Sequence, residues 1–238
     1  MNNYKLSFST SGNAKLDKTI AVLSLPSGFT CPGAAECLAK ADRDTGKITD
    51  GPLAKYRCFA ASAEAAFSSV RKQRWYNHLL LFEAKTKDNM AELIERSLPK
   101  NEVIRIHVGG DFFSQTYFDA WLKVIKNHPE KRFYAYTKSL KFWVARLLDI
   151  PPNFNLTGSR GGRFDHLIDE HGLRCVRVFF HPEEAAAMGL EIDHDDKHAI
   201  FGVDDFGLLL HGQGKKDSPH AAALARMRDE KIEYAYSK

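Results

Sequence analysis

Predicted strands and helices alternate through the middle of this 238-residue chain, and the alternation restricts the fold more than any other feature. We expect strands at residues 103–108, 132–137, 153–157 and 175–180, with helices between them over 115–126 and 141–148. This order indicates parallel βαβ units, because two parallel strands need a long crossover that is usually a helix.

The two ends of the chain complete the expected architecture. Before the alternation we expect strands at 4–9 and 20–25, a loop-rich stretch over 29–58, and helices over 62–85 and 89–97. After it we expect a short helix opened by Pro182, a hairpin of 198–203 with 207–211, and a last helix from about Ser218.

The total of about six strands predicts one α/β domain with a parallel-stranded, incomplete (β/α) barrel. Residues 1–60 would form the strand and loop segment that carries three cysteines. Residues 61–190 would form the βα units, and residues 191–238 the C-terminal hairpin and helix.

Composition excludes several classes of protein. No apolar run approaches the roughly 20 residues that span a bilayer, and the polar start does not resemble a signal peptide. We therefore expect a cytoplasmic protein without a membrane partner. The formal net charge of +4 is compatible with an anionic partner but does not require one. The oligomeric state is left open.

Three of the four cysteines lie in one irregular segment with the spacing C-x5-C-x20-C. Thiolates on loops bind iron–sulfur clusters and zinc well, so we expect Cys31, Cys37 and Cys58 to be metal ligands. Three thiolates would leave one iron of a [4Fe–4S] cluster open to an outside ligand. The alternative is that they are buried side chains of an ordinary loop. Cys175 lies inside a predicted strand and is expected in the core.

Polar residues follow three predicted parallel strands, at the sheet edge where α/β folds place their active sites. Two glycines permit a ligand to approach the backbone closely. We expect a cofactor site of Gly109, Gly110, Asp111, Ser159 and Arg160, with Asp111 and Lys138 as catalytic residues. The alternative is a plain turn in which Asp111 caps the next helix and the cations are solvated.

Two further segments have functional and structural interpretations. A basic and aromatic stretch predicts a nucleic-acid contact through Arg71, Lys72, Arg74 and Trp75, or else an amphipathic helix with its basic face in water. The acidic and histidine-rich residues 191–198 are expected to form a solvated turn before a strand, with a metal site as the alternative.

The chain resembles the phage gene product 88 family in five short motifs, which are SGNAKL at 11–16, LP at 25–26, TCPGA at 30–34, GGDF at 109–112 and YTKS at 136–139. The similarity extends to about Gly212. The resemblance implies a phage origin, and hence the host cytoplasm, more than it implies a chemistry.

The same order of features is similar, at a distance, to the radical S-adenosylmethionine superfamily. Those enzymes bind a [4Fe–4S] cluster through three cysteines after the first barrel strand. A GGE-like motif after the second strand takes the methionine amino group of the cofactor. The resemblance implies a cluster on Cys31, Cys37 and Cys58, Asp111 in the acidic position, and the cofactor's ribose or carboxylate near Ser159 and Arg160.

These observations favour a metalloenzyme with an iron–sulfur cluster and S-adenosylmethionine, acting on a nucleotide or nucleic acid. One alternative is a zinc-stabilised barrel that exchanges or hydrolyses a nucleobase with Asp111. Another is a DNA-binding phage accessory protein whose cysteines only hold a loop together.

Overall fold

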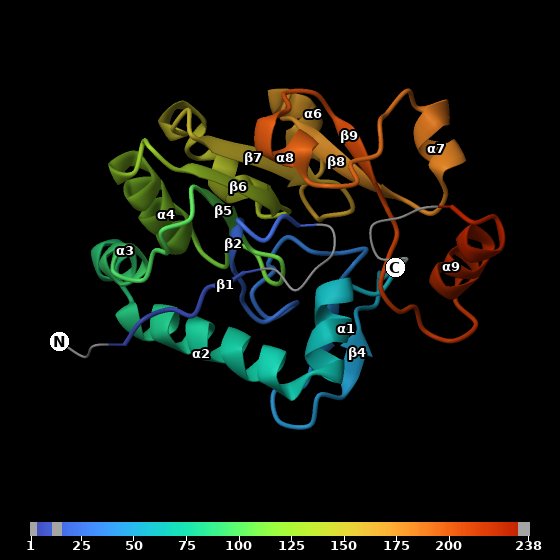
Figure 1. The fold of residues 1–238 in the computed structure, drawn as a ribbon, viewed down its shortest axis with the longest axis horizontal. Helices are drawn as coiled ribbons and strands as arrows, with labels where there is room; N and C mark the ends of the chain where they lie inside the picture. Colours follow the sequence, from blue (N-terminus) through green and yellow to red (C-terminus); the bar gives the residue numbers. More distant parts are fainter. Residues whose placement is uncertain (1–3, 11–15, 233–238) are drawn as a thin grey trace.

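The computed structural model describes residues 4–10 and 16–232, so most of the SGNAKL motif lies outside the described residues. A seven-stranded sheet forms its centre (Figure 1). In spatial order its strands are β1 (Ser9–Thr10), β2 (Ala21–Leu23), β5 (Val103–Ile106), β6 (Arg132–Thr137), β7 (Phe154–Ser159), β8 (Cys175–Phe179) and β9 (Phe206–Leu209).

Six of these strands, from β2 to β9, are parallel and lie in the same order in the sheet as in the chain. Only β1 is antiparallel, at the edge beside β2. The predicted βαβ units are therefore confirmed. Their carboxyl ends all meet at one edge of the sheet.

The sheet curves around a cavity. Strands β5, β6, β8 and β9 all contribute side chains to it, through Arg105, Tyr136, Val178 and Leu208. Within the described ranges β2 and β9 do not pair with each other, so the structure shows an open, curved sheet and not a closed barrel.

Alternating residues of the strands separate two apolar clusters. On the outer face, Leu23, Ile104 and Phe133 pack against the helices α2 (Ser68–Ala84), α3 (Lys87–Glu95) and α4 (Gln115–Asn127). On the inner face, Val22, Tyr134, Val176 and Phe206 pack against α8 (Lys197–Phe201). Asp196, the residue before α8, lines the cavity on this inner face.

The N-terminal third differs in detail from the expectation. The predicted loop contains a small hairpin of β3 (Ala39–Ala41) and β4 (Ile48–Asp50). The single helix expected over 62–85 is two helices, α1 (Phe59–Ala66) and α2, because the chain becomes extended at Phe67. The helix expected over 141–148 is the shorter α5 (Leu140–Val144), followed by a 3-10 turn (Leu147–Asp149).

The predicted C-terminal hairpin is wrong in its first half. Residues expected as a strand form the helix α8, and β9 pairs in parallel with β8. Two short helices, α6 (His166–His171) and α7 (Pro182–Ala187), flank β8, and α9 (Pro219–Asp229) follows β9. As expected, Ser218 caps α9 by accepting from the Ala221 amide, with Pro219 in the first turn.

Among the helices of the described segments, none combines the length and apolar character needed to cross a membrane.

Candidate functional site

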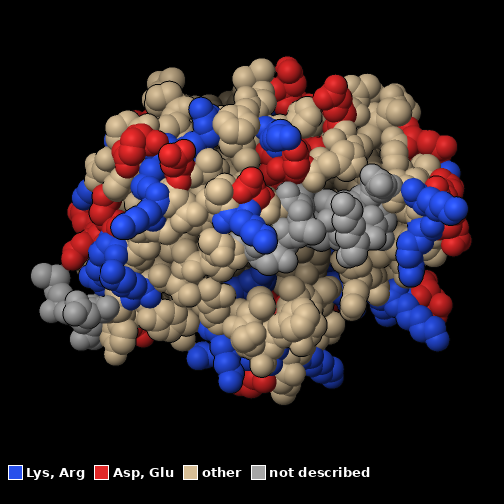
Figure 2. Space-filling model, in the orientation of Figure 1, with Lys and Arg blue, Asp and Glu red and all other residues tan. Residues whose placement is uncertain are grey.

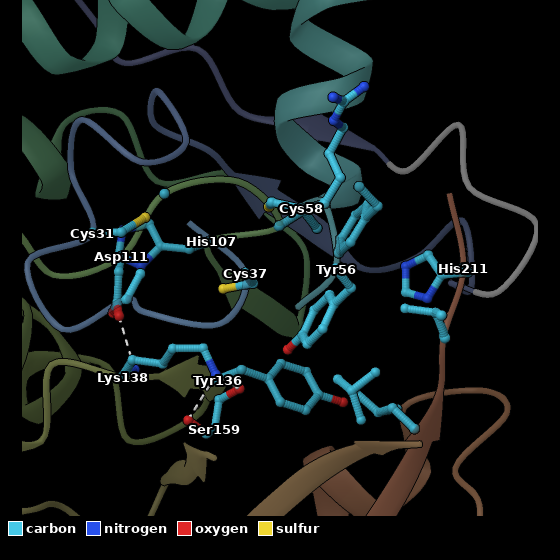
Figure 3. A pocket seen from close by; sticks show the side chains of 18 of the residues that line it. Cys31, Cys37, Tyr56, Cys58, His107, Asp111, Tyr136, Lys138, Ser159 and His211 are labelled. Carbon is cyan, nitrogen blue, oxygen red and sulfur yellow. Dashed lines mark hydrogen bonds between the residues drawn. The ribbon is translucent and has the colours of Figure 1, made fainter. Parts of the chain in front are cut away.

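A cavity of about 160 Å³ opens at the carboxyl ends of the parallel strands, and we call it the cysteine pocket (Figure 3). Its lining includes all three cysteines of the predicted metal site, which come from two segments of the chain. It also includes Gly110, Asp111, Lys138 and Ser159 of the predicted cofactor site. The structure thus brings together most of the residues that the sequence singled out.

A tight turn after β2 positions Cys31. The Thr30 hydroxyl donates to the Pro26 carbonyl at 2.8 Å, and the Thr30 amide donates to the same oxygen at 3.2 Å. The Gly28 amide in turn donates to Cys31 Sγ at 3.3 Å, which helps to orient the sulfur. The turn is therefore set by local bonding and does not need a metal to form.

The loop that carries Cys37 rests on the loop after β7. The Glu36 amide donates to the Gly161 carbonyl at 2.9 Å, and the Arg163 amide donates to the Gly33 carbonyl at 2.8 Å. A side chain at Gly33 would lie 1.9 Å from the Lys138 carbonyl oxygen, so this position must be glycine. The loops after β2, β6 and β7 consequently interlock around the cysteine pocket.

Cys58 lies at the N-terminus of α1. The Ala60 and Ala61 amides and the Arg74 guanidinium lower the pKa of its thiol, whereas burial, the larger effect, raises that pKa to about 11. A helix N-terminus and a nearby cation both favour an anionic sulfur. Arg74, expected on a nucleic-acid surface, instead lies close to this cysteine.

The three thiols influence one another. Burial is the main reason that the pKa of Cys31 lies well above its usual value, and Asp111, Cys58 and Cys37 raise it further. Burial also raises the pKa of Cys37, and Lys138 opposes that shift. At neutral pH the metal-free thiols are therefore protonated, and a bound metal would have to displace those protons.

The three cysteines of the pocket do not form a closely grouped donor set. Within residues 4–10 and 16–232, no three His, Cys, Asp or Glu side chains converge closely enough to hold one metal ion. A single Zn²⁺ would draw its sulfurs to about 2.3 Å from itself. An iron–sulfur cluster contains several metal and sulfide atoms, so its thiolate ligands surround a larger body. The described residues of the cysteine pocket therefore show no preformed site for a single metal ion.

Asp111 joins the ends of β5 and β6. Its Oδ1 accepts from the Thr137 hydroxyl and the Phe112 amide, both at 2.7 Å, and its Oδ2 accepts from the Lys138 amide at 2.8 Å. Burial raises its pKa while these bonds lower it. The carboxylate therefore serves the fold as well as the pocket, and Oδ2 keeps capacity for a further donor.

The Lys138 side chain is hydrogen-bonded to the end of β7 and the loop that follows it. Its ammonium group donates to the Ser159 carbonyl and hydroxyl, each at 2.9 Å, and to the Arg160 carbonyl. The Arg160 guanidinium pairs with Asp169 at 2.5 Å and lines a neighbouring cavity. Of the predicted cofactor residues, Arg160 is thus turned away from the cysteine pocket, whereas Ser159 lines it.

The glycines before Asp111 are required by the protein's own packing. An added side chain at Gly109 would lie 2.4 Å from Arg74 Nη1, and one at Gly110 would lie 2.6 Å from the Thr30 hydroxyl. Gly110 also has a φ of +83°. Gly109 therefore lets the β5 loop pack against α2, and Gly110 lets it pack against the cysteine segment. Of the two, Gly110 lines the pocket and Gly109 does not.

The floor of the pocket holds an ion pair that sequence reasoning missed. Asp196 is 1% exposed, and its Oδ2 accepts from Arg105 Nη1 at 2.5 Å and from the Tyr134 hydroxyl at 2.9 Å. The Tyr136 hydroxyl donates to Oδ1 at 3.2 Å. The expectation of a solvated turn over 191–198 is wrong at Asp193 and Asp196, which are both buried. The surrounding acidic residues gave no sign that the Asp196 carboxylate, at the N-terminus of α8, is buried against the sheet.

Two of the four predicted nucleic-acid residues are buried. Arg71 donates to backbone carbonyls, and Arg74 pairs with Glu64, so neither guanidinium is available to a phosphate. Lys72 is exposed, and the Trp75 ring contacts Phe29. On the face shown in Figure 2, lysines and arginines are interspersed with acidic residues. Cys175 is buried, as expected, with its sulfur 3.2 Å from Arg160 Nε.

Comparison with known proteins gives one family. A family model described as Gene product 88 matches residues 2–230. The Gene 88 proteins of Mycobacterium phages L5 and D29 are 33% and 32% identical over 129 residues. Each alignment covers 49% of this chain and 46% of the relative, so the chain spans about half the length of these relatives. No solved structure matches. These matches lend no support to the resemblance to radical S-adenosylmethionine enzymes.

Proposed function

This chain belongs to the gene product 88 family, and we propose that its cysteine pocket makes it an iron–sulfur enzyme. The observation that carries the proposal is the arrangement of Cys31, Cys37 and Cys58 around one pocket beside a buried carboxylate, Asp111. We propose further that the enzyme uses S-adenosylmethionine and acts on a nucleotide or nucleic acid.

Topology supports the choice of cofactor. Six sequentially ordered parallel strands curve around the pocket, with the cysteine segment after the first of them and Asp111 after the second. The segment with Cys31 and Cys37, together with Asp111, thus lies at the edge where parallel α/β folds bind ligands. A cluster on these three cysteines would keep one iron for an outside ligand, and Asp111 lines the same pocket.

The chain's own residues would bind the cluster and orient the cofactor. A reduced cluster would supply the single electron for reductive cleavage of S-adenosylmethionine, and the bound cofactor would supply the radical chemistry. The three thiolates would hold the cluster, and the Arg74 and Lys138 cations would balance part of their charge. Asp111 Oδ2 would accept a hydrogen bond from the cofactor. The curved sheet would exclude water from the reacting atoms.

The activity test is consumption of S-adenosylmethionine by anaerobically reconstituted protein with dithionite. We expect consumption that depends on the reductant and falls at least about tenfold in Cys31→Ala, because one lost ligand removes the cluster. Cys175→Ala, which lies outside the pocket, is the matched control and should keep the activity. A protein that holds a cluster but neither binds nor consumes the cofactor would refute its use. Zinc with reductant-independent base exchange would favour the zinc enzyme instead.

Thiol reactivity tests the burial of the site in the metal-free protein. Only the thiolate reacts with iodoacetamide, and burial raises the pKa of Cys58 to about 11. Its alkylation rate, followed by peptide mass spectrometry, should therefore rise about tenfold per pH unit from pH 7 to 9.5 without levelling. A cysteine placed on the exposed face of α2, by Lys72→Cys, should level off near pH 8.5 to 9. Levelling of Cys58 in that range would contradict a pKa raised to about 11.

A further inference from the structure

Part of the wall of the cysteine pocket is aromatic. Tyr56, Phe59, Tyr136 and His211 line it, and the Phe59 and His211 rings lie 4.4 Å apart between centroids (Figure 3). Val178, Leu208 and Leu210 add apolar surface. Flat aromatic groups pack well against such walls by stacked and edge-to-face contacts. The shape and chemistry of this wall therefore suit a planar ring.

The cations of the pocket are already paired. Arg57 makes a two-pronged contact with Asp50 at 2.8 and 2.6 Å, and Arg105 pairs with Asp196 at 2.5 Å. Lys138 donates to oxygens of the loop after β7. A phosphate in the pocket would have to break one of these pairs, and breaking a buried pair is costly. None of these three cations is therefore available to a phosphate without the loss of its present partner.

His107 adds a polar side chain to the lining of the same pocket. Its ring is 3% exposed and its Nε2 lies 3.0 Å from the Tyr117 hydroxyl, while its buried Nδ1 has no partner among the described residues. Burial lowers the pKa of the imidazole to about 3, so the ring is neutral at physiological pH. Buried polar atoms are rarely left unpaired, which points to a ligand at Nδ1.

Backbone conformation marks the same place. Among the described residues, five non-glycine residues have positive φ, and two of these, His107 and Asp196, are buried and line the cysteine pocket. The other three, Lys85, Asp217 and Lys231, are exposed. Strained backbone that is held in place by buried surroundings concentrates at functional sites. The backbone at His107 and Asp196 is thus held in an unfavourable conformation, which costs the folded protein some stability.

From the aromatic wall, the paired cations and the unpartnered His107 Nδ1, we propose that the substrate group entering this pocket is an uncharged nitrogen heterocycle, a nucleobase carried by a free nucleoside. Its plane packs among the aromatic rings and its polar edge hydrogen bonds to His107. The inference deepens the proposed function by naming the substrate class, but nucleoside binding itself does not require the cluster.

Isothermal titration calorimetry of the reconstituted protein tests the inference with adenosine, guanosine, cytidine and uridine beside their 5′-monophosphates. At least one nucleoside should bind. The dissociation constant of its monophosphate should lie within about threefold of the nucleoside's, since the cations of the pocket are already paired. His107→Gln should weaken binding about tenfold, the usual effect of one lost hydrogen bond. Phe82→Ala, an exposed aromatic outside the pocket, is the control and should bind as before.

A second variant, Val178→Phe, fills the pocket from β8 and should abolish binding even if His107→Gln does not fold. The inference is overturned if no nucleoside binds, if the monophosphate binds more than about tenfold tighter, or if S-adenosylmethionine displaces the nucleoside. The two proposals fail separately. A cluster without nucleoside binding refutes only this inference, and nucleoside binding without iron refutes only the iron–sulfur function.

Discussion

Replacing Glu64 by alanine is expected to lower the free energy of unfolding by about 3–5 kcal/mol, because it leaves the buried Arg74 guanidinium without its carboxylate partner. Glu64 is fully buried, and its Oε1 accepts from Arg74 Nη1 at 2.5 Å. The same oxygen accepts from the Ser27 amide at 2.9 Å and the Ser27 hydroxyl at 2.8 Å. One carboxylate thus ties the cysteine segment to α1 and α2.

Urea denaturation followed by circular dichroism measures this loss as a lower midpoint with an unchanged slope. Glu92→Ala is the matched control, because that glutamate makes an exposed pair with Arg96 on α3 and should cost less than about 0.5 kcal/mol. A loss below about 1 kcal/mol in Glu64→Ala would show that the cysteine segment does not depend on this carboxylate.

Asp196→Ala is expected to cost about 3–5 kcal/mol as well, since Arg105 and two tyrosine hydroxyls would lose their shared acceptor. Alanine is also strained at the φ of +63° found there, whereas asparagine tolerates that conformation. Asp196→Asn should therefore lose distinctly less than Asp196→Ala in the same urea experiment.

Asp195→Ala is the control for this pair. Its exposed carboxylate pairs with the exposed Lys197 at 2.5 Å, so its removal should change the unfolding free energy by less than about 1 kcal/mol. Equal losses in Asp195→Ala and Asp196→Ala would contradict the assignment of Asp196 to a buried pair under the sheet.

The repeating βα pattern was readable from the sequence because each parallel strand is a buried apolar run with a helix after it. Residues 103–108 and 132–137 were placed well for that reason, as was the convergence of Asp111, Lys138 and Ser159 at one sheet edge. The parallel topology brings the carboxyl ends of the strands together, and this placement does not depend on the directions of individual side chains.

The direction of individual side chains was not readable. Arg71 and Arg74 lie in a basic and aromatic stretch that is typical of a nucleic-acid surface. In the structure, however, Arg71 donates to backbone carbonyls and Arg74 pairs with Glu64, so both side chains point inward. Asp196 sits in a run of charged residues that resembles a solvated turn. Its burial depends on Arg105, 91 residues earlier, and a single sequence carries no signal for a pairing of that range.

Analysis of iron, sulfide and zinc in anaerobically purified protein, with its absorption spectrum, tests the central claim most directly. The cysteine pocket predicts iron and sulfide in about equal amounts and a broad absorption near 400 nm. Both should be lost in Cys31→Ala, Cys37→Ala and Cys58→Ala but kept in Cys175→Ala. A colourless protein without iron, or one whose iron survives all three pocket substitutions, would contradict the claim that these cysteines hold an iron–sulfur cluster.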